Sequence, residues 1–96
     1  PDLGIKCVAD HAWVTGAETC ELALALDAIG HRDAALEQVR AMQHLRDRDG
    51  AYWTGFVHTE GVRWPVERST WTAAAMLLAL DAVTDHSAGA AIFRLA

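Results

Sequence analysis

Apolar residues recur at helical spacing in three stretches of the chain, residues 15–29, 32–46 and 69–83. Side chains three and four positions apart lie on one face of an α-helix, so this spacing predicts three helices. Most of these apolar residues are Ala and Leu, which favour helix. Ser69 or Thr70 can begin the third helix, because a side-chain oxygen at the N-cap accepts a hydrogen bond from an unpaired backbone N–H.

The first helix carries signals at both of its ends. Thr15 and Glu18 have the T-x-x-E spacing of a capping box, in which the two side chains satisfy two backbone N–H groups that lack helical partners. Gly30 follows the last apolar residue and indicates the end of the helix, because glycine tolerates a positive φ.

The three predicted helices differ in how their apolar residues are distributed. Residues 32–46 have one apolar stripe, whereas the second halves of 15–29 and 69–83 are apolar nearly all round. A helix that is apolar on every side must be covered on most sides. We therefore expect the first and third helices to form an inner layer and the second an outer layer. We also expect the chain to be a homo-oligomer or to contact the remainder of a larger chain, because one outer helix cannot cover two inner ones.

Residues 47–68 break the helical pattern. Two short β-like pieces, Tyr52-Trp53 and residues 56–58, can pair within this segment. A loop of this length is uncommon inside a domain and is usually functional where it occurs. Four turn signals interrupt it: Asp49-Gly50, Thr54-Gly55, Glu60-Gly61 and Trp64-Pro65.

Composition and charge narrow the possible partners. The chain has 96 residues, of which 52% are apolar, and a formal net charge of −5. An acidic chain without a Lys/Arg cluster is a poor nucleic-acid ligand, because phosphate contacts dominate that affinity. No apolar run approaches the ~20 residues that span a bilayer, and no signal peptide is visible, so we expect a cytoplasmic protein without a membrane span. Cys7 and Cys20 lack CxxC spacing, which favours two reduced thiols over a disulfide or a metal site, and we expect no cofactor.

The segment after the second helix resembles a known family. Residues 49–53 and 64–72 are similar to the end of the α/α toroid of protein prenyltransferases and squalene/hopene-type terpene cyclases. That family repeats a Gln, then a Gly and an aromatic residue, at the ends of its outer helices, and Gln43, Gly50 and Trp53 fit that repeat loosely. The acidic DxDD motif and the zinc ligands of the family have no match here, so its catalytic residues are not carried over.

The helix pattern and the resemblance together predict an all-α fold. It would consist of α/α hairpins in a partial α/α toroid, with inner and outer helix layers and a long Trp-rich loop. Residues 24–28 and 78–82 share the sequence Leu-Ala-Leu-Asp-Ala, which is typical of a repeated hairpin. Residues 1–96 would then be a single helical domain, about the C-terminal third of a larger α/α barrel.

Two groups of residues that can carry chemistry precede the predicted inner helices. Loops before inner helices face the same rim of a barrel, so these groups can line one mouth. Aromatic rings there can stack on sugars or stabilise cations, and a carboxylate can act as a general acid or base. We also expect Trp64, Glu67 and Trp71 to lie close together at the start of the third helix. The candidate catalytic residues are Asp10, His11 and Glu67, and the candidate substrate-binding residues are Trp13, Tyr52, Trp53, Trp64 and Trp71.

Each of these candidates also has a structural interpretation. Tryptophan commonly anchors long loops by packing beneath them. Asp10 and His11 can belong to an ordinary turn, and Glu67-Arg68 is often a solvated or salt-bridged pair.

Three functional hypotheses follow. The resemblance implies a fragment of a prenyltransferase- or cyclase-like protein that binds an isoprenoid or other hydrophobic substrate at the barrel mouth. One alternative is a six-hairpin glycosidase-like protein, which has the same architecture, uses Trp-rich loops and carboxylates, and takes a carbohydrate ligand. The other is a non-catalytic helical interaction module. The enzyme hypotheses require Asp10, Glu67 and the tryptophans to face one pocket, and the module requires an exposed apolar face.

Overall fold

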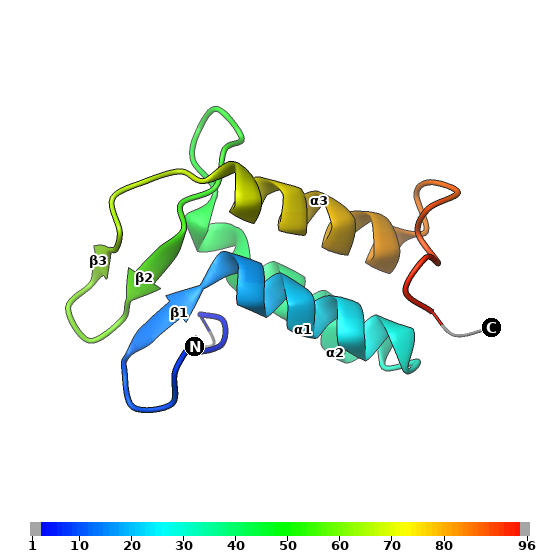
Figure 1. Ribbon diagram of the computed structural model, residues 1–96, viewed down its shortest axis with the longest axis horizontal. Helices are drawn as coiled ribbons and strands as arrows, with labels where there is room; N and C mark the ends of the chain where they lie inside the picture. The colour runs from blue at the N-terminus through cyan, green and yellow to red at the C-terminus, as the bar shows by residue number, and fades with distance from the viewer. Residues whose placement is uncertain (1–2, 95–96) are drawn as a thin grey trace.

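The computed structural model describes residues 3–94, which combine helices with a small antiparallel sheet. The sheet lies at one end of the helices, as Figure 1 shows. The elements are β1 (Trp13–Thr15), α1 (Gly16–Ala28), α2 (Arg32–Ala41), the 3₁₀ helix η1 (Met42–Leu45), β2 (Gly55–Val57), β3 (Val62–Arg63) and α3 (Thr70–Thr84). No helix within the described residues is long and apolar enough to span a bilayer.

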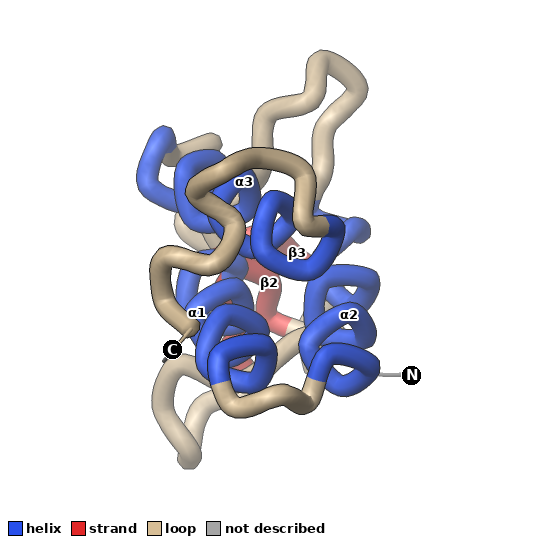
Figure 2. The backbone as a smooth tube through the Cα atoms, turned by 90° about the vertical axis from the view of Figure 1, so that its right-hand side faces the viewer, coloured by secondary structure: helices blue, strands red, loops and turns tan. Residues whose placement is uncertain are grey.

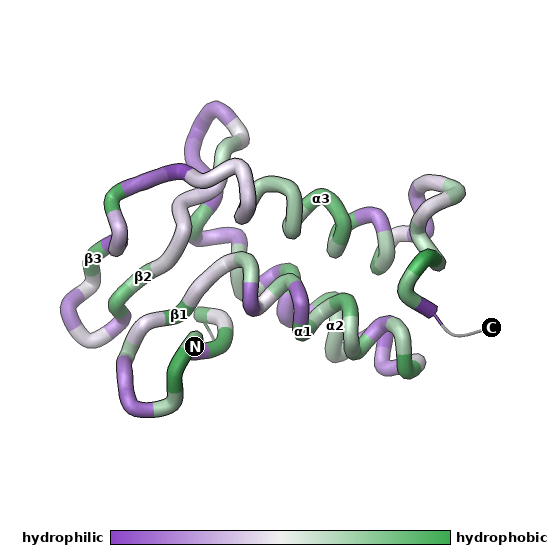
Figure 3. The backbone as a smooth tube through the Cα atoms, in the orientation of Figure 1, coloured by the Kyte–Doolittle hydropathy of each residue, from purple (hydrophilic) through white to green (hydrophobic). Residues whose placement is uncertain are grey.

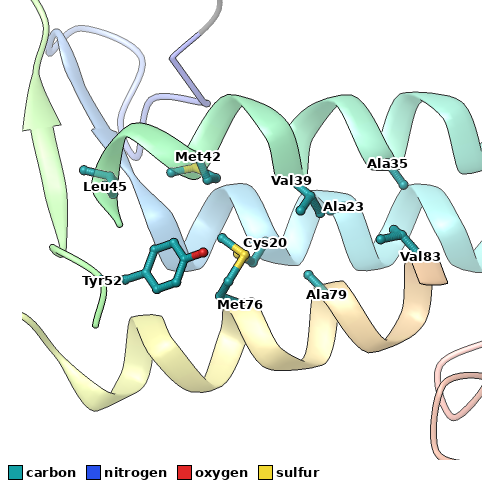
Figure 4. Packing of buried hydrophobic residues seen from close by; sticks show 10 residues of the cluster. All are labelled: Cys20, Ala23, Ala35, Val39, Met42, Leu45, Tyr52, Met76, Ala79 and Val83. Atoms are coloured by element: carbon teal, nitrogen blue, oxygen red, sulfur yellow. The ribbon is translucent and has the colours of Figure 1, made fainter. Parts of the chain in front are cut away.

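The three helices pack against one another as a bundle, seen end-on in Figure 2. In Figure 1, α1 and α3 both run away from the sheet and α2 runs back toward it. The buried cluster between them consists largely of small and flexible side chains, as Figure 4 shows. Small side chains allow the helices to approach closely. A Cβ on Gly16 at the start of α1 would lie 2.6 Å from Cγ2 of Thr72 on α3. The cluster comprises Cys20, Ala23, Ala35, Val39, Met42, Leu45, Tyr52, Met76, Ala79 and Val83.

The predicted helix ends are partly confirmed. Ser69 is the N-cap of α3, and its side chain accepts a hydrogen bond from the Thr72 backbone N–H at 3.1 Å. Gly30 follows α1 with a φ of 89°, the positive value expected of a helix-ending glycine.

The predicted capping box at the start of α1 is wrong. Thr15 is the N-cap, but its side chain makes no capping hydrogen bond. Its buried hydroxyl finds no hydrogen-bond partner within residues 3–94. Glu18 instead accepts a hydrogen bond from the Cys7 thiol at 3.5 Å. Because Thr15 is also the last residue of β1, the sheet fixes the direction in which the helix begins.

The prediction of an all-α toroid is wrong, because three segments outside the helices pair as a sheet. The strand order is β1-β2-β3, and both pairs are antiparallel. Trp13 lies opposite Val57 and Thr15 opposite Gly55, so the sheet joins positions about 40 residues apart. Strands of two or three residues are too short to show an alternating pattern, which is why the sequence did not reveal them. The fold is therefore α+β.

The predicted difference in helix burial holds only in part. Within α1 several positions around the helix are buried, from Gly16 to Asp27, whereas α2 buries Ala35 and Val39. Residues 22–29 and 76–83 are not fully covered as expected, because Ile29, the C-cap residue of α1, is 68% exposed and Leu77 of α3 is 69% exposed. These residues have no covering layer within the described part of the chain.

An ionic cluster holds the C-terminal tail against the helices. Arg94 contacts Asp27 through its Nε atom at 2.8 Å and Asp85 through its Nη1 atom at 2.7 Å. Arg32 contacts Asp85 as well, also at 2.7 Å. Asp27 lies near the end of α1 and is buried, so its charge requires such a partner. Figure 1 shows the tail folding back beside the ends of the helices.

A second ionic group holds the turn that follows η1. Arg68, just before α3, contacts Asp47 at 3.1 Å and Asp49 at 2.6 Å. The Ala51 backbone N–H and the Arg68 guanidinium together hold the pKa of Asp49 below its usual value. The turn is therefore tied to the start of α3.

Met42 tests the packing of the bundle, because it is fully buried where η1 meets the helices. We expect Met42→Ala to lower the free energy of unfolding by about 2–5 kcal/mol through lost contacts and a cavity. Urea denaturation measures this change. Val66→Ala removes methyl groups from a residue that is 80% exposed and should change stability by less than about 0.5 kcal/mol. Equal effects of the two substitutions would contradict this packing.

Asp85 makes the ionic cluster sensitive to acid. The Arg94 and Arg32 guanidinium groups hold its pKa below the usual 3.8. A depressed pKa in the folded state means that the carboxylate stabilises the fold above about pH 3.8, and that this stabilisation is lost as pH falls through the folded pKa. We expect Asp85→Asn to lower the melting temperature at neutral pH and to flatten its decline below pH 3.8. If the melting temperatures of the two proteins fall in parallel between neutral pH and pH 2.5, Asp85 does not cause the acid sensitivity.

Candidate functional site

A cleft of about 510 Å³ opens beside β1 and the turn between β2 and β3. Its lining combines two tryptophans, two carboxylates and a histidine with small apolar side chains and one threonine. Concave surfaces of this composition are typical of ligand sites in proteins. The lining residues are Val8, Asp10, His11, Ala12, Trp13, Val57, Thr59, Glu60 and Trp64.

The two tryptophans form the best-defined part of the cleft. The rings of Trp13 and Trp64 meet edge to face, with centroids 5.2 Å apart and planes at 76°. Trp13 also donates a hydrogen bond from Nε1 to the Trp64 backbone carbonyl at 2.7 Å. Trp64 follows β3 and precedes a cis bond to Pro65, and its side chain remains 55% exposed. One ring is thus fixed by the sheet and the other presents a face to solvent.

Gly55 on β2 allows this arrangement. A Cβ at this position would collide with Nε1 of Trp13 and would lie 2.7 Å from the Val14 carbonyl oxygen. Since that oxygen belongs to the backbone, it cannot move aside as a flexible side chain can. A residue larger than glycine would therefore disturb both the β1–β2 pairing and the Trp13–Trp64 contact.

The charged groups reach the cleft from two separate loops. Asp10 and His11 come from the loop before β1, and their side chains lie 3.9 Å apart at Oδ1 and Nε2. Glu60 comes from the turn between β2 and β3, where its backbone N–H donates to the Val57 carbonyl at 3.2 Å. The cleft therefore carries carboxylates on both loops, with an imidazole beside one of them.

Two predicted site residues lie elsewhere. Glu67 accepts a hydrogen bond from the Thr54 hydroxyl at 3.3 Å, and its backbone carbonyl accepts one from the Thr54 N–H at 3.1 Å. Trp71 lines a separate groove between α1 and α3, where Phe93 also lies. Trp64 therefore lines a different surface from Trp71, although Trp64 lies shortly before α3 and Trp71 lies in its first turn.

Tyr52 and Trp53 also have different surroundings from the cleft residues. Tyr52 is buried in the core and donates its hydroxyl to Oε1 of Gln43 at 2.9 Å. Trp53 packs beneath two guanidinium groups, with Arg63 4.8 Å and Arg68 5.7 Å from its ring centroid. It lines a second cleft, of about 630 Å³, that also contains His44 and Phe56. The structure thus brings Asp10, His11, Trp13 and Trp64 together and separates the other candidates from them.

Glu60 is the cleft residue that sequence reasoning missed. Glu60-Gly61 is a turn signal in the sequence, but the place of Glu60 in the same cleft as Asp10 depends on the pairing of β1 with β2. Recognising a hairpin around this turn would have placed the carboxylate at the edge of the sheet.

The cysteines lie outside the cleft, and both are free thiols. Burial raises the pKa of the Cys20 thiol to about 12, so it remains protonated at neutral pH and acts as a core residue. Within residues 3–94, no three His, Cys, Asp or Glu side chains are grouped so that they could hold a metal ion.

Comparison with known proteins points to one enzyme. No family model matches the sequence. Over 94 residues the chain is 63% identical to an MMP endo-(1,4)-3-O-methyl-alpha-D-mannosidase of Mycolicibacterium hassiacum. The match covers 98% of this chain and 26% of that enzyme, so the chain spans about a quarter of its relative's length.

This comparison overturns the resemblance to prenyltransferases and terpene cyclases, because the relative is a mannosidase. The residues that suggested the resemblance have local roles in the structure. Gln43 binds the Tyr52 hydroxyl, and Gly50 occupies a tight turn with a φ of 90°. The Gln, Gly and aromatic residues are thus explained by a tight turn and a buried hydrogen bond. The mannosidase relative supports the glycosidase alternative better than the prenyltransferase hypothesis.

Proposed function

We propose that this chain contributes a carbohydrate-binding site to a mannoside-cleaving protein, and that the sugar lies in the Trp13–Trp64 cleft. The observation that carries the proposal is the edge-to-face tryptophan pair flanked by carboxylates on two loops. The 63% identity to a mannosidase supports the class of ligand.

The lining of the cleft suits a methylated sugar. A sugar ring has apolar C–H faces that pack on aromatic rings, and the exposed face of Trp64 is available for such a contact. The relative's name includes a 3-O-methyl group, which adds apolar surface to the sugar. Val8 and Val57 lie in the cleft and can cover that methyl group, because burying apolar surface is favourable.

The carboxylates suit the remaining hydroxyl groups and the reaction. Ionised carboxylates accept hydrogen bonds, so Asp10 and Glu60, which both line the cleft, can bind sugar hydroxyls. Glycosidases most often use a pair of carboxyl groups on either side of the scissile bond, one as acid and the other as base or nucleophile. We propose Asp10 and Glu60 as this pair, and the His11 imidazole lies beside Asp10, with Nε2 3.9 Å from Oδ1. Glu60 takes the role first assigned to Glu67, because Glu67 does not line the cleft and accepts a hydrogen bond from the Thr54 hydroxyl instead.

Trp64→Ala tests sugar binding. The substitution removes the exposed ring but keeps the backbone carbonyl that Trp13 binds, so the sheet should remain intact. We expect it to weaken binding of α-(1→4)-linked 3-O-methylmannose oligosaccharides at least about tenfold, or ~1.4 kcal/mol. Titration followed by intrinsic tryptophan fluorescence measures the affinity. Trp71→Ala removes an even more exposed tryptophan, 70% against 55% for Trp64, from the other groove and should leave the affinity unchanged. Equal losses in both variants would remove the cleft as the sugar site.

The catalytic pair is tested in a chimaera that carries this chain in place of the matching 94-residue segment of the M. hassiacum mannosidase. We expect Glu60→Gln to lower the release of reducing ends about 100-fold or more, as loss of a general acid or base does. Glu67→Gln is the matched control, because it makes the same chemical change outside the cleft. If the chimaera with Glu60→Gln keeps full activity while still binding the oligosaccharide, Glu60 has no catalytic role and the cleft only binds.

A further inference from the structure

The outward face of α3 is apolar and uncovered. Three large side chains of α3 are exposed: Trp71 at 70%, Leu77 at 69% and Leu78 at 47%. No charged residue occurs between Thr70 and Leu80. Figure 3 shows apolar colouring along most of α3. A helix that faces water normally presents charged side chains on that side, so this face is suited to contact another apolar surface.

The adjoining groove is shaped to receive large apolar side chains. It has a volume of about 320 Å³ and lies where α1 meets α3. Ala74 and Ala75 contribute small side chains to it, and Leu24, Leu78 and Phe93 contribute large ones. Among the described residues, Glu21 of α1 is the one charged residue that lines it. Rows of small and large side chains of this kind accept the side-chain ridges of a packed helix. Arg94 holds the tail that carries Phe93 against the helices through Asp27 and Asp85.

Two carboxylates border the apolar face, Glu21 of α1 and Asp81 of α3. Asp81 is the acidic residue of α3, and its two carboxylate oxygens accept hydrogen bonds from the backbone N–H and the hydroxyl of Ser87, at 2.7 and 2.6 Å. The exposed surface of α2, in contrast, carries Arg32, Glu37 and Arg40. The molecule therefore has a polar helical side at α2 and an apolar one at α3.

We infer that the apolar face of α1 and α3 is an interface for further apolar helices of the same polypeptide. These helices would correspond to the three quarters of the mannosidase that lie outside the matched segment. A covering segment on the same polypeptide acts at a high effective concentration, which favours it over a second copy of the chain. The inference concerns the face on α3 and does not depend on sugar binding in the Trp13–Trp64 cleft.

The test uses two separate polypeptides: this chain, and the M. hassiacum mannosidase without its matching segment, carrying an affinity tag. When the two are co-expressed, we expect this chain to co-purify with the tagged part in a one-to-one complex, measured by size exclusion with light scattering. Ala74→Glu introduces a charge on the apolar face and should reduce the co-purified amount at least tenfold. Ala34→Glu makes the same change at an exposed position of α2 and should have no effect. Leu77→Gln, which adds no charge, should reduce the amount as well.

Circular dichroism of each variant alone verifies that the helices are retained. The inference is overturned if no complex forms, or if Ala74→Glu and Ala34→Glu reduce it equally. It is also overturned if this chain forms a tight dimer that Ala74→Glu abolishes and that excludes the tagged part, because a second copy would then occupy the face. This assay does not measure sugar binding. A negative result here would therefore not affect the proposal that the Trp13–Trp64 cleft binds sugar, which the fluorescence titration with Trp64→Ala tests separately.

Discussion

The pairing of β1 with β2 is the contact on which the candidate site depends. It places Trp13 opposite Val57 and so brings the loop before α1 beside the hairpin that precedes α3. Trp13 and Trp64 are 51 positions apart in the sequence, and this pairing brings their side chains into contact. Gly55 lets the strands approach, since a side chain there would meet the Val14 carbonyl. A sheet of very short strands thus brings together the loops that carry the side chains of the cleft.

The helices support this sheet and impose a second constraint. Close packing through residues such as Ala23 and Ala79 uses one side of α1 and of α3 for the internal core. Because both helices are apolar beyond that side, packing the core leaves apolar surface outside it, at Leu77 and at Trp71. The cleft and the apolar face therefore lie on different parts of the same bundle, the first at the sheet and the second along the helices.

Ionic contacts fix the irregular segments at the two ends of the bundle. Arg68 ties the turn after η1 to the start of α3, near the second cleft. Arg94 ties the tail to the buried carboxylate of Asp27 and to Asp85 at the far end. These segments have few buried apolar side chains of their own, so charge-assisted hydrogen bonds hold them in place.

Local physical chemistry made the helices predictable from the sequence. Apolar spacing depends on residues three and four positions apart, and the Ser69 cap and the Gly30 end depend on a few neighbouring atoms. The same reasoning predicted that α1 and α3 are too apolar for one further helix to cover, and Leu77 and Trp71 are indeed exposed on α3. The site could be predicted only in part, since Asp10, His11 and Trp13 are neighbours in the sequence. Tertiary structure alone decided that Trp64 and Glu60 join them while Glu67 and Trp71 do not. That choice rests on long-range pairing between strands of two and three residues, which leave no periodic pattern in the sequence.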